Sequence, residues 1–376
     1  MKKIKKTKVI SIIVLLIIII LLAITIGLYI GNKDVKAYID KNILKKEIDE
    51  QDLIQIGLEN NSSVYSYGNY IAILYNNTLN IYTSDGKKIT SMDVLISNPK
   101  FVSKKDYLLL FDENGNNAYL IHNTTMEWKK QTEGEISLAT INGNGMCALA
   151  LSKTTYKTII VLYEKDGTES FRTYLSTTYT TDMGISEDNK YFSFTEMNTS
   201  GTQIISNVKN ISIEKAKSTP NDAIENNYSL EDNNRIFINI EYKKDDIVAY
   251  ADDAIYLLSN GNKDKIVDID NNVSFADIKL NGYACIVNTK NKDEYELDIY
   301  NVESKKYNAY LFKDNVKSIY CYDNIIALNY GNKVEFVNLN GWLIKRFTPT
   351  QNFKNIILRD NRALFIYKDR VEILNI

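Results

Sequence analysis

The pattern of apolar and polar residues divides the chain into three parts. An uncharged apolar run extends from Val9 to Ile30. Residues 33–52 place apolar side chains at helical spacing among dense charges of both signs. From about Leu53 onward, short β-branched and aromatic runs alternate with turn signals such as Asn-Gly and Asp-Gly. The pattern predicts a long apolar helix, a short amphipathic helix and an all-β region.

The apolar run is long enough to cross a membrane. At 1.5 Å per residue, residues 9–30 span about 33 Å, against a hydrocarbon core of about 30 Å. Five lysines precede the run, at positions 2, 3, 5, 6 and 8, and positive flanks stay in the cytoplasm. We therefore predict a cytoplasmic tail over 1–8, a single transmembrane helix over 9–30 and an extracytoplasmic remainder. A cleaved signal peptide is the alternative, but its apolar region is about 7–15 residues and ends in small residues.

The segment 31–52 is predicted to be a helical stalk. Its apolar residues recur every three or four positions, as at Val35, Ile39 and Ile43. A spacer helix is the simplest interpretation. A dimerising coiled coil is the alternative, although the segment holds fewer than three heptads.

The all-β region, 53–376, contains a repeat of an apolar strand, a tight turn, a second strand, a polar turn and a third strand. Eight copies begin near residues 70, 107, 146, 191, 246, 283, 325 and 363. Their spacing near 40 residues is that of a four-stranded propeller blade. Further strands precede several copies, at 99–103, 275–280, 316–321 and 353–359. We predict an all-β propeller with eight four-stranded blades.

The irregular section over 211–245 leaves two alternatives open. It contains the longest interval and the polar stretch around Pro220, which we interpret as an inserted loop before a strand over 234–242. Seven blades with an insertion is the main alternative. Two smaller domains that divide at this section are the other.

The ends of the repeat region predict how the ring closes. The last copy ends at Val371–Ile376 without an outer strand, whereas residues 52–57 precede the first copy and lack a partner. The early segment can supply the missing strand. Closure of this kind would tie the two ends of the domain together.

The charge of the chain bears on which molecules it can bind, and its cysteines bear on whether it relies on disulfides. The formal net charge is −2, and since the tail lysines contribute +5, the rest of the chain carries −7. An acidic ectodomain predicts no binding of nucleic acid. The three cysteines, Cys147, Cys285 and Cys321, are widely spaced and odd in number, so we interpret them as small core residues rather than a disulfide framework. The abundance of Ile, Asn and Lys suggests a low-GC Gram-positive bacterium.

The whole chain resembles a group of membrane-anchored β-propeller proteins of uncharacterised function from clostridia-like Gram-positive bacteria. The resemblance rests on the lysine tail, the single anchor and repeats with turns such as Tyr82–Lys88 and Tyr163–Gly167. These turns are also similar to those of quinoprotein-like and WD-type propellers. Tryptophan occurs only at Trp128 and Trp342, so the regular tryptophan of quinoprotein blades is missing. The resemblance implies no known active site.

The chain contains one histidine, which limits the catalytic and metal sites that it could form. The single histidine, His122, precedes the polar turn Asn123–Thr125, where we expect an exposed side chain at an outer hairpin. A Ser-His-Asp or Cys-His site would need this residue, and a multi-histidine zinc site is excluded.

Acidic residues leave one route to enzyme chemistry. The candidate pairs are Asp252 with Asp253, Asp245 with Asp246, and Asp268 with Asp270, but aspartate is common in turns. The stretch Asp112–Asn117 faintly resembles a calcium loop, although its glycine is misplaced and an Asn-Gly hairpin turn explains it better. We predict no catalytic, cofactor-binding or metal-binding residue.

The predicted function follows from the anchor, the repeats and the lack of catalytic motifs. The 27 tyrosines suit strands and blade packing, and they also suit a face that binds protein or glycan. We predict a non-enzymatic, membrane-tethered interaction or scaffold module at the cell envelope with a protein partner. A glycan-binding or glycan-cleaving propeller and an ectodomain sensor acting through a partner are the alternatives.

Overall fold

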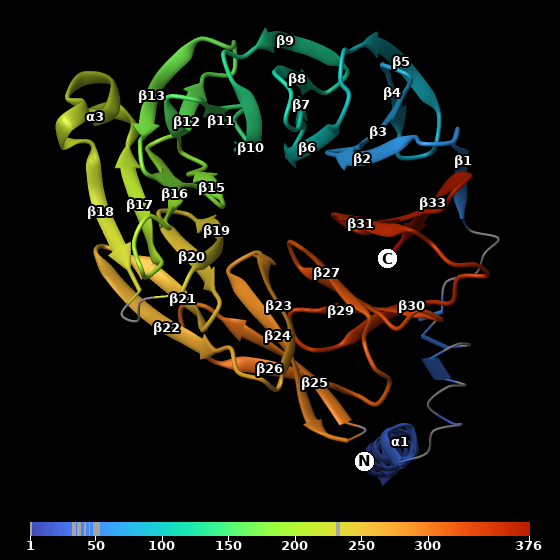
Figure 1. Ribbon diagram of the computed structural model, residues 1–376. Helices are drawn as coiled ribbons and strands as arrows, with labels where there is room; N and C mark the ends of the chain where they lie inside the picture. The colour runs from blue at the N-terminus through green and yellow to red at the C-terminus, as the bar shows by residue number, and fades with distance from the viewer. Residues whose placement is uncertain are drawn as a thin grey trace.

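The chain folds into a closed ring of eight β-sheets that follow one another around a central channel (Figure 1). The computed structural model describes residues 2–31, 35, 39–40, 43–44, 46–47, 53–230, 234–292 and 294–376. Seven sheets have four strands, and in the fourth blade two short strands, β14 and β15, share the innermost place. The prediction of an eight-bladed propeller is confirmed, and the alternatives of seven blades or two domains are wrong.

Each blade is an antiparallel sheet whose strands follow one another outward from the channel. The innermost strands are β2 (Ser63–Tyr67), β6 (Pro99–Lys104), β10 (Glu135–Ile141), β14 (Thr178–Tyr179) with β15 (Met183–Ile185), β19 (Phe237–Lys243), β23 (Val273–Leu280), β27 (Ser318–Tyr322) and β31 (Asn355–Arg359). The second strands are β3 (Tyr70–Tyr75), β7 (Tyr107–Asp112), β11 (Cys147–Lys153), β16 (Tyr191–Asn198), β20 (Asp246–Ala251), β24 (Tyr283–Asn291), β28 (Ile325–Asn329) and β32 (Arg362–Ile366).

The outer half of each blade completes the sheet. The third strands are β4 (Thr78–Thr83), β8 (Asn117–His122), β12 (Tyr156–Tyr163), β17 (Ile205–Ser212), β21 (Ala254–Ser259), β25 (Glu294–Asn301), β29 (Val334–Asn338) and β33 (Arg370–Asn375). The outermost strands are β5 (Lys88–Asp93), β9 (Thr125–Gln131), β13 (Glu169–Leu175), β18 (Ile224–Ser229), β22 (Asn262–Asp268), β26 (Tyr307–Phe312), β30 (Leu343–Phe347) and β1 (Ile54–Gly57). We number the blades one to eight from the β2 sheet to the β31 sheet.

The core lies between the blades. The second strand of blade three is buried from Cys147 to Leu151, because both faces of the strand meet neighbouring sheets. Leu109 and Phe111 of blade two pack in the same cluster as this strand. Similar clusters fill the other seams, so each sheet buries the apolar surface that it could not bury alone.

The ring closes where the sequence predicted. Strand β1 pairs antiparallel with β33, with Ile54 opposite Ile373 and Gly57 opposite Arg370. Ile56 of β1 is buried in a cluster that also contains Ile71 of blade one. The first described strand of the ring therefore supplies the outer strand of the eighth blade.

The section 211–245 differs from its predicted polar loop. It contains helix α3 (Ile213–Ser218), the 3₁₀ turn η2 (Pro220–Asp222) and the outermost strand β18 of blade four. The side chain of Ser212 caps α3 by accepting a hydrogen bond from the backbone N–H of Lys215. The cap at Ser212 ends strand β17, and the proline at position 220 ends the short helix before strand β18 begins.

The apolar run forms helix α1 (Lys2–Gly31), which lies outside the ring on the side of blades six and seven (Figure 1). Its residues Ile10–Ile30 are long and apolar enough to cross a membrane. Most of the predicted stalk, 31–52, lies outside the described residues. Within the described part, Tyr29 donates a hydrogen bond to Asp40 at 2.7 Å, and Lys46 lies 3.3 Å from the same carboxylate. The carbonyl of Lys46 accepts from the backbone N–H of Arg346 in β30, so this segment contacts blade seven.

Ring closure can be tested by weakening β1. Replacing Ile56 by alanine should lower the free energy of unfolding by about 2–4 kcal/mol, because the buried side chain packs across the seam between blades eight and one. Denaturant unfolding followed by fluorescence measures the change. Exposed Gln55 on the same strand is the matched control, and an equal loss in Gln55→Ala and Ile56→Ala would contradict the closure role.

Candidate functional site

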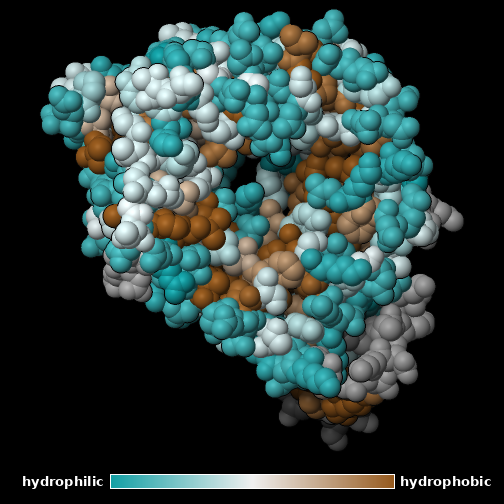
Figure 2. Space-filling model, in the orientation of Figure 1, coloured by the Kyte–Doolittle hydropathy of each residue, from teal (hydrophilic) through white to brown (hydrophobic). Residues whose placement is uncertain are grey.

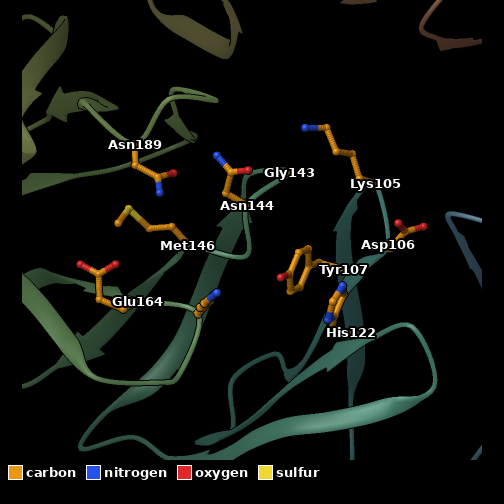
Figure 3. A pocket seen from close by; sticks show the side chains of 10 residues that line it. Lys105, Asp106, Tyr107, His122, Gly143, Asn144, Met146, Glu164 and Asn189 are labelled. Carbon is orange, nitrogen blue, oxygen red and sulfur yellow. The ribbon is translucent and has the colours of Figure 1, made fainter.

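A cleft of about 540 Å³ lies between blades two, three and four. It opens on the side of the ring that carries the turns between innermost and second strands, which we call the cleft face. Its lining residues come from these turns and from the turns before the outermost strands: Lys105, Asp106, Tyr107, His122, Gly143, Asn144, Met146, Glu164, Lys165 and Asn189 (Figure 3). Figure 2 shows hydrophilic residues over much of the outer rim, with hydrophobic patches beside the opening of the ring.

Tight turns bring the three blades together at the cleft. Lys105 and Asn189 adopt left-handed backbone conformations, with φ of 47° and 61°, which suit short hairpin turns. Gly143 lies close to both neighbouring blades, because a Cβ at this position would lie 2.5 Å from Oε2 of Glu187 and 2.7 Å from Cδ of Lys105. The turns of blades two, three and four are therefore in direct contact.

One wall of the cleft is an aromatic pair. The rings of Tyr107 and His122 stack with centroids 4.2 Å apart and planes 10° from parallel. Nδ1 of His122 lies 3.4 Å from a carboxylate oxygen of Glu127, and Asn123 is within hydrogen-bond distance of Nε2. Figure 3 shows both rings on the same side of the cleft, across from Asn144 and Glu164. His122 ends β8 at an outer hairpin, as predicted, but its side chain is only partly exposed because it stacks on Tyr107.

Charges of both signs surround the aromatic pair. Lys105 forms an ion pair with Glu187 at 3.1 Å, and Glu187 also accepts from the backbone N–H of Gly143. Glu164 pairs with Lys217 of α3 at 2.7 Å. These ion pairs connect blades two, three and four, and they leave a polar surface suited to hydrogen bonding.

Beside the cleft, a buried arginine joins several blades within the channel. Arg359 at the end of β31 is 7% exposed and donates to the carbonyl of Ser66 in blade one at 2.9 and 3.0 Å. It also donates to the hydroxyl of Ser103 in blade two. Its guanidinium lies 4.5 Å from the ring centre of Tyr322 in blade seven. A single side chain therefore contacts three blades besides its own.

A second polar contact crosses the channel. Nζ of Lys104 in blade two lies 2.7 Å from a carboxylate oxygen of Glu241 in blade five. Burial disfavours the charge of Lys104, but the neighbouring Glu241 outweighs burial and holds the pKa of Lys104 above its ordinary value. The ion pair places a polar bridge across the cleft-face end of the channel.

The aspartates singled out from the sequence stabilise turns or lie at a strand end. Asp252 accepts from the backbone N–H of Ile236, and Asp253 accepts from the hydroxyl of Tyr256 at 2.7 Å. Asp268 pairs with Lys265 within its own strand.

The remaining acids also occupy turns. Asp270 accepts from the backbone N–H of Asn272, and Asp246 begins β20 directly after Asp245 in a hairpin turn. None of these acids lines the cleft. The predicted hairpin turn at Asp112–Asn117 is confirmed, because Gly115 donates its N–H to the carbonyl of Asp112 between β7 and β8. Within the described residues, no group of three or more His, Cys, Asp or Glu could hold a metal ion.

A different carboxyl pair occurs on β25 of blade six. Asp298 is 3% exposed and accepts from Nδ2 of Asn288 at 2.7 Å, while its other oxygen lacks a hydrogen-bond partner in the described structure. Glu296, two residues away on the same strand face, pairs with Lys290 at 3.0 Å. Burial, together with the adjacent Glu296, raises the pKa of Asp298 to about 7. Asp298 therefore keeps its proton to a higher pH than an exposed aspartate would. The Glu-Leu-Asp spacing within a strand was the available sequence signal.

The fold defines the chain as an eight-bladed β-propeller. More particularly, it belongs to a family of unknown function, DUF5711, whose model matches residues 42–376. A search of curated proteins finds no match.

Several solved structures share the fold. BamB from Moraxella catarrhalis is 9% identical with a TM-score of 0.54, over 86% of this chain and 98% of that one. The C-terminal WD40 domain of Sif2 is 10% identical with a TM-score of 0.57, over the same shares of each chain. Sqt1 from Chaetomium thermophilum, bound to the N-terminus of ribosomal protein L10, is 11% identical with a TM-score of 0.53, over 85% of this chain and all of that one.

The carboxyl pair predicts a pH-dependent stability. The pKa of Asp298 is raised from 3.8 to about 7, so between these values the folded chain keeps a proton that the unfolded chain loses. Stability should fall as pH rises through this window. Asp298→Asn keeps the shape of the protonated acid, so at pH 8 it should stabilise the fold by about 1–2 kcal/mol, with little effect near pH 4.

Thermal unfolding at both pH values measures this effect. Asp268→Asn is the matched control, since the side chain of Asp268 is 72% exposed in the neighbouring blade. A gain in Asp298→Asn that does not change with pH would contradict a proton held by Asp298.

Proposed function

We propose that this protein is a non-enzymatic, membrane-tethered propeller that binds a protein partner outside the cytoplasm through its cleft face. The observation that carries the proposal is the cleft itself. It joins turns of three blades, presents an aromatic pair and offers charges of both signs. Such a surface suits a polar peptide segment, because side chains and backbone groups can both find partners there.

The preorganisation of the cleft supports a binding role. Its principal charges are already held by partners, as Lys105 is by Glu187 and Glu164 by Lys217. Side chains fixed in this way lose little conformational freedom on binding. Among similar folds, the structure of Sqt1 holds the N-terminus of ribosomal protein L10, which gives a precedent for a ring of this type binding a protein segment.

The N-terminal segment supports the proposed location. Helix α1 contains Ile10–Ile30, which can cross a membrane, and the lysines before it favour a cytoplasmic N-terminus. The contacts from Tyr29 through Asp40 and Lys46 to blade seven favour a ring held near the membrane surface. The cleft lies in blades two to four, on the other side of the ring from this attachment.

A photo-crosslinking amino acid placed at Asn144 tests the binding role. In intact cells it should capture a specific protein, because Asn144 lines the cleft. The same probe at Leu95 is the control, since this exposed residue lies between blades one and two on the face opposite the cleft. Adding Lys105→Glu should abolish capture at residue 144. An adduct with carbohydrate alone would replace the proposal by the glycan-binding alternative, and equal adducts at 144 and 95 would contradict it.

Protease treatment tests the orientation. Protease added to intact cells stripped of their wall should degrade the propeller and leave only an anchor fragment. An epitope tag at the N-terminus should survive until the membrane is lysed. Protection of the propeller until lysis would overturn the extracytoplasmic placement.

A further inference from the structure

Two of the three cysteines meet across a blade seam. Sγ of Cys285 in β24 lies 3.5 Å from Sγ of Cys321 in β27, so the contact joins blade six to blade seven. Both are free thiols, and Cys285 is fully buried whereas Cys321 is partly exposed. Cys147 is buried alone in blade three, between blades two and four.

The seam around the two thiols is also bridged by other contacts. Leu280 of β23 forms a bridge with Asp323, directly after β27. Farther out, the hydroxyl of Tyr310 in blade six donates to Glu335 in blade seven at 2.9 Å. Blade seven in turn contacts Lys46 through Arg346. A covalent link at this seam would therefore join the two blades nearest to helix α1.

We propose that Cys285 and Cys321 form a reversible disulfide that links blade six to blade seven under oxidising conditions. A sulfur–sulfur bond is about 2.05 Å long, so the two sulfur atoms need to approach by about 1.5 Å. Small adjustments of the two side chains can supply this movement, since neither thiol is held by any other hydrogen bond in the described structure. The link closes a loop between positions 36 residues apart, which constrains the unfolded chain.

The reaction is a thiol–disulfide exchange with a small external disulfide as oxidant. Cys321, the less buried of the two residues, loses its proton and attacks one sulfur of the oxidant, releasing one thiolate and forming a mixed disulfide. Cys285 then loses its proton and attacks the Sγ of Cys321, which releases the second thiolate. The two released thiolates take up the two protons. The protein pair is oxidised by two electrons, and the external disulfide is reduced to two thiols.

The environment of the Cys321 thiol determines how fast the disulfide forms. Burial, and beside it the thiol of Cys285, raises the pKa of Cys321 well above its ordinary value. Little thiolate is present at neutral pH, so oxidation should be slow and should accelerate as pH rises.

The test uses the full chain in detergent micelles with 2-hydroxyethyl disulfide as the probe. Non-reducing peptide mapping should show one peptide pair joined through Cys285 and Cys321, with the loss of two hydrogens. Cys147→Ser should give the same link, whereas Cys321→Ser should not form it. Oxidation should raise the midpoint of thermal unfolding by about 5 °C in the native chain and in Cys147→Ser, and dithiothreitol should reverse the shift.

Three results would overturn the proposal. One is a map in which both thiols stay reduced while the same cysteines react in the denatured chain. Another is a mixed disulfide at Cys321 that Cys285 does not resolve. The third is a link that involves Cys147 or a second molecule. Because the map of the native chain decides among these results, the inference does not depend on whether Cys321→Ser folds.

Discussion

The structure depends on closing a ring of sheets that each have two apolar faces. A single blade can bury such faces only against neighbours on both sides, and an open row would leave two of them in water. The pairing of β1 with β33 removes both ends at once, with Ile54 opposite Ile373. The buried side chain of Ile56 then packs in the seam with blade one. The closed channel and the packing of blade eight against blade one both depend on this pairing.

Polar groups fix the blades relative to one another where apolar packing alone would not. Arg359 is buried without a carboxylate among its described hydrogen bonds, so its charge is stabilised by the Ser66 carbonyl, the Ser103 hydroxyl and the Tyr322 ring. Glu335 in blade seven is likewise buried, yet Tyr310, Tyr330 and Arg346 donate to both of its oxygens. Apolar packing depends little on direction, whereas hydrogen bonds and ion pairs form only at particular relative orientations of two blades. These polar contacts therefore help to fix the orientation of each blade.

The sequence predicted most of the fold because the propeller repeats one local pattern. Apolar inner strands and short turns recur with each blade, so the strands before the copies, such as β6 and β31, fell close to their expected bounds. The last repeat lacks an outer strand, and this predicted that an early segment, now β1, pairs with β33 to close the ring. Helix α3 was not predicted. It is a single short helix that begins at the cap of Ser212 and is followed by a turn at Pro220, and so brief an element leaves no helical periodicity in the sequence.

The candidate site was much less visible in the sequence, because it is assembled between blades. Tyr107, Asn144 and Glu164 lie in three separate hairpins, and no spacing rule connects them. The same holds for Cys285 and Cys321, whose contact depends on the angle between two sheets. Glu296 and Asp298 are the exception, since two acids separated by one residue in a strand must share a face.

The pairing of β1 with β33 also sets an order of events during synthesis. The first strand of the ring is made before any blade exists, but its partner is made only after the other seven blades. Strand β1 must therefore remain unpaired, with its backbone groups exposed, while most of the chain is produced. Helix α1, which is long and apolar enough to cross a membrane, precedes it in the chain and is made before it. Closing the ring therefore requires β33 to find an edge made more than 300 residues earlier, so this long-range pairing is expected to be a late event of folding.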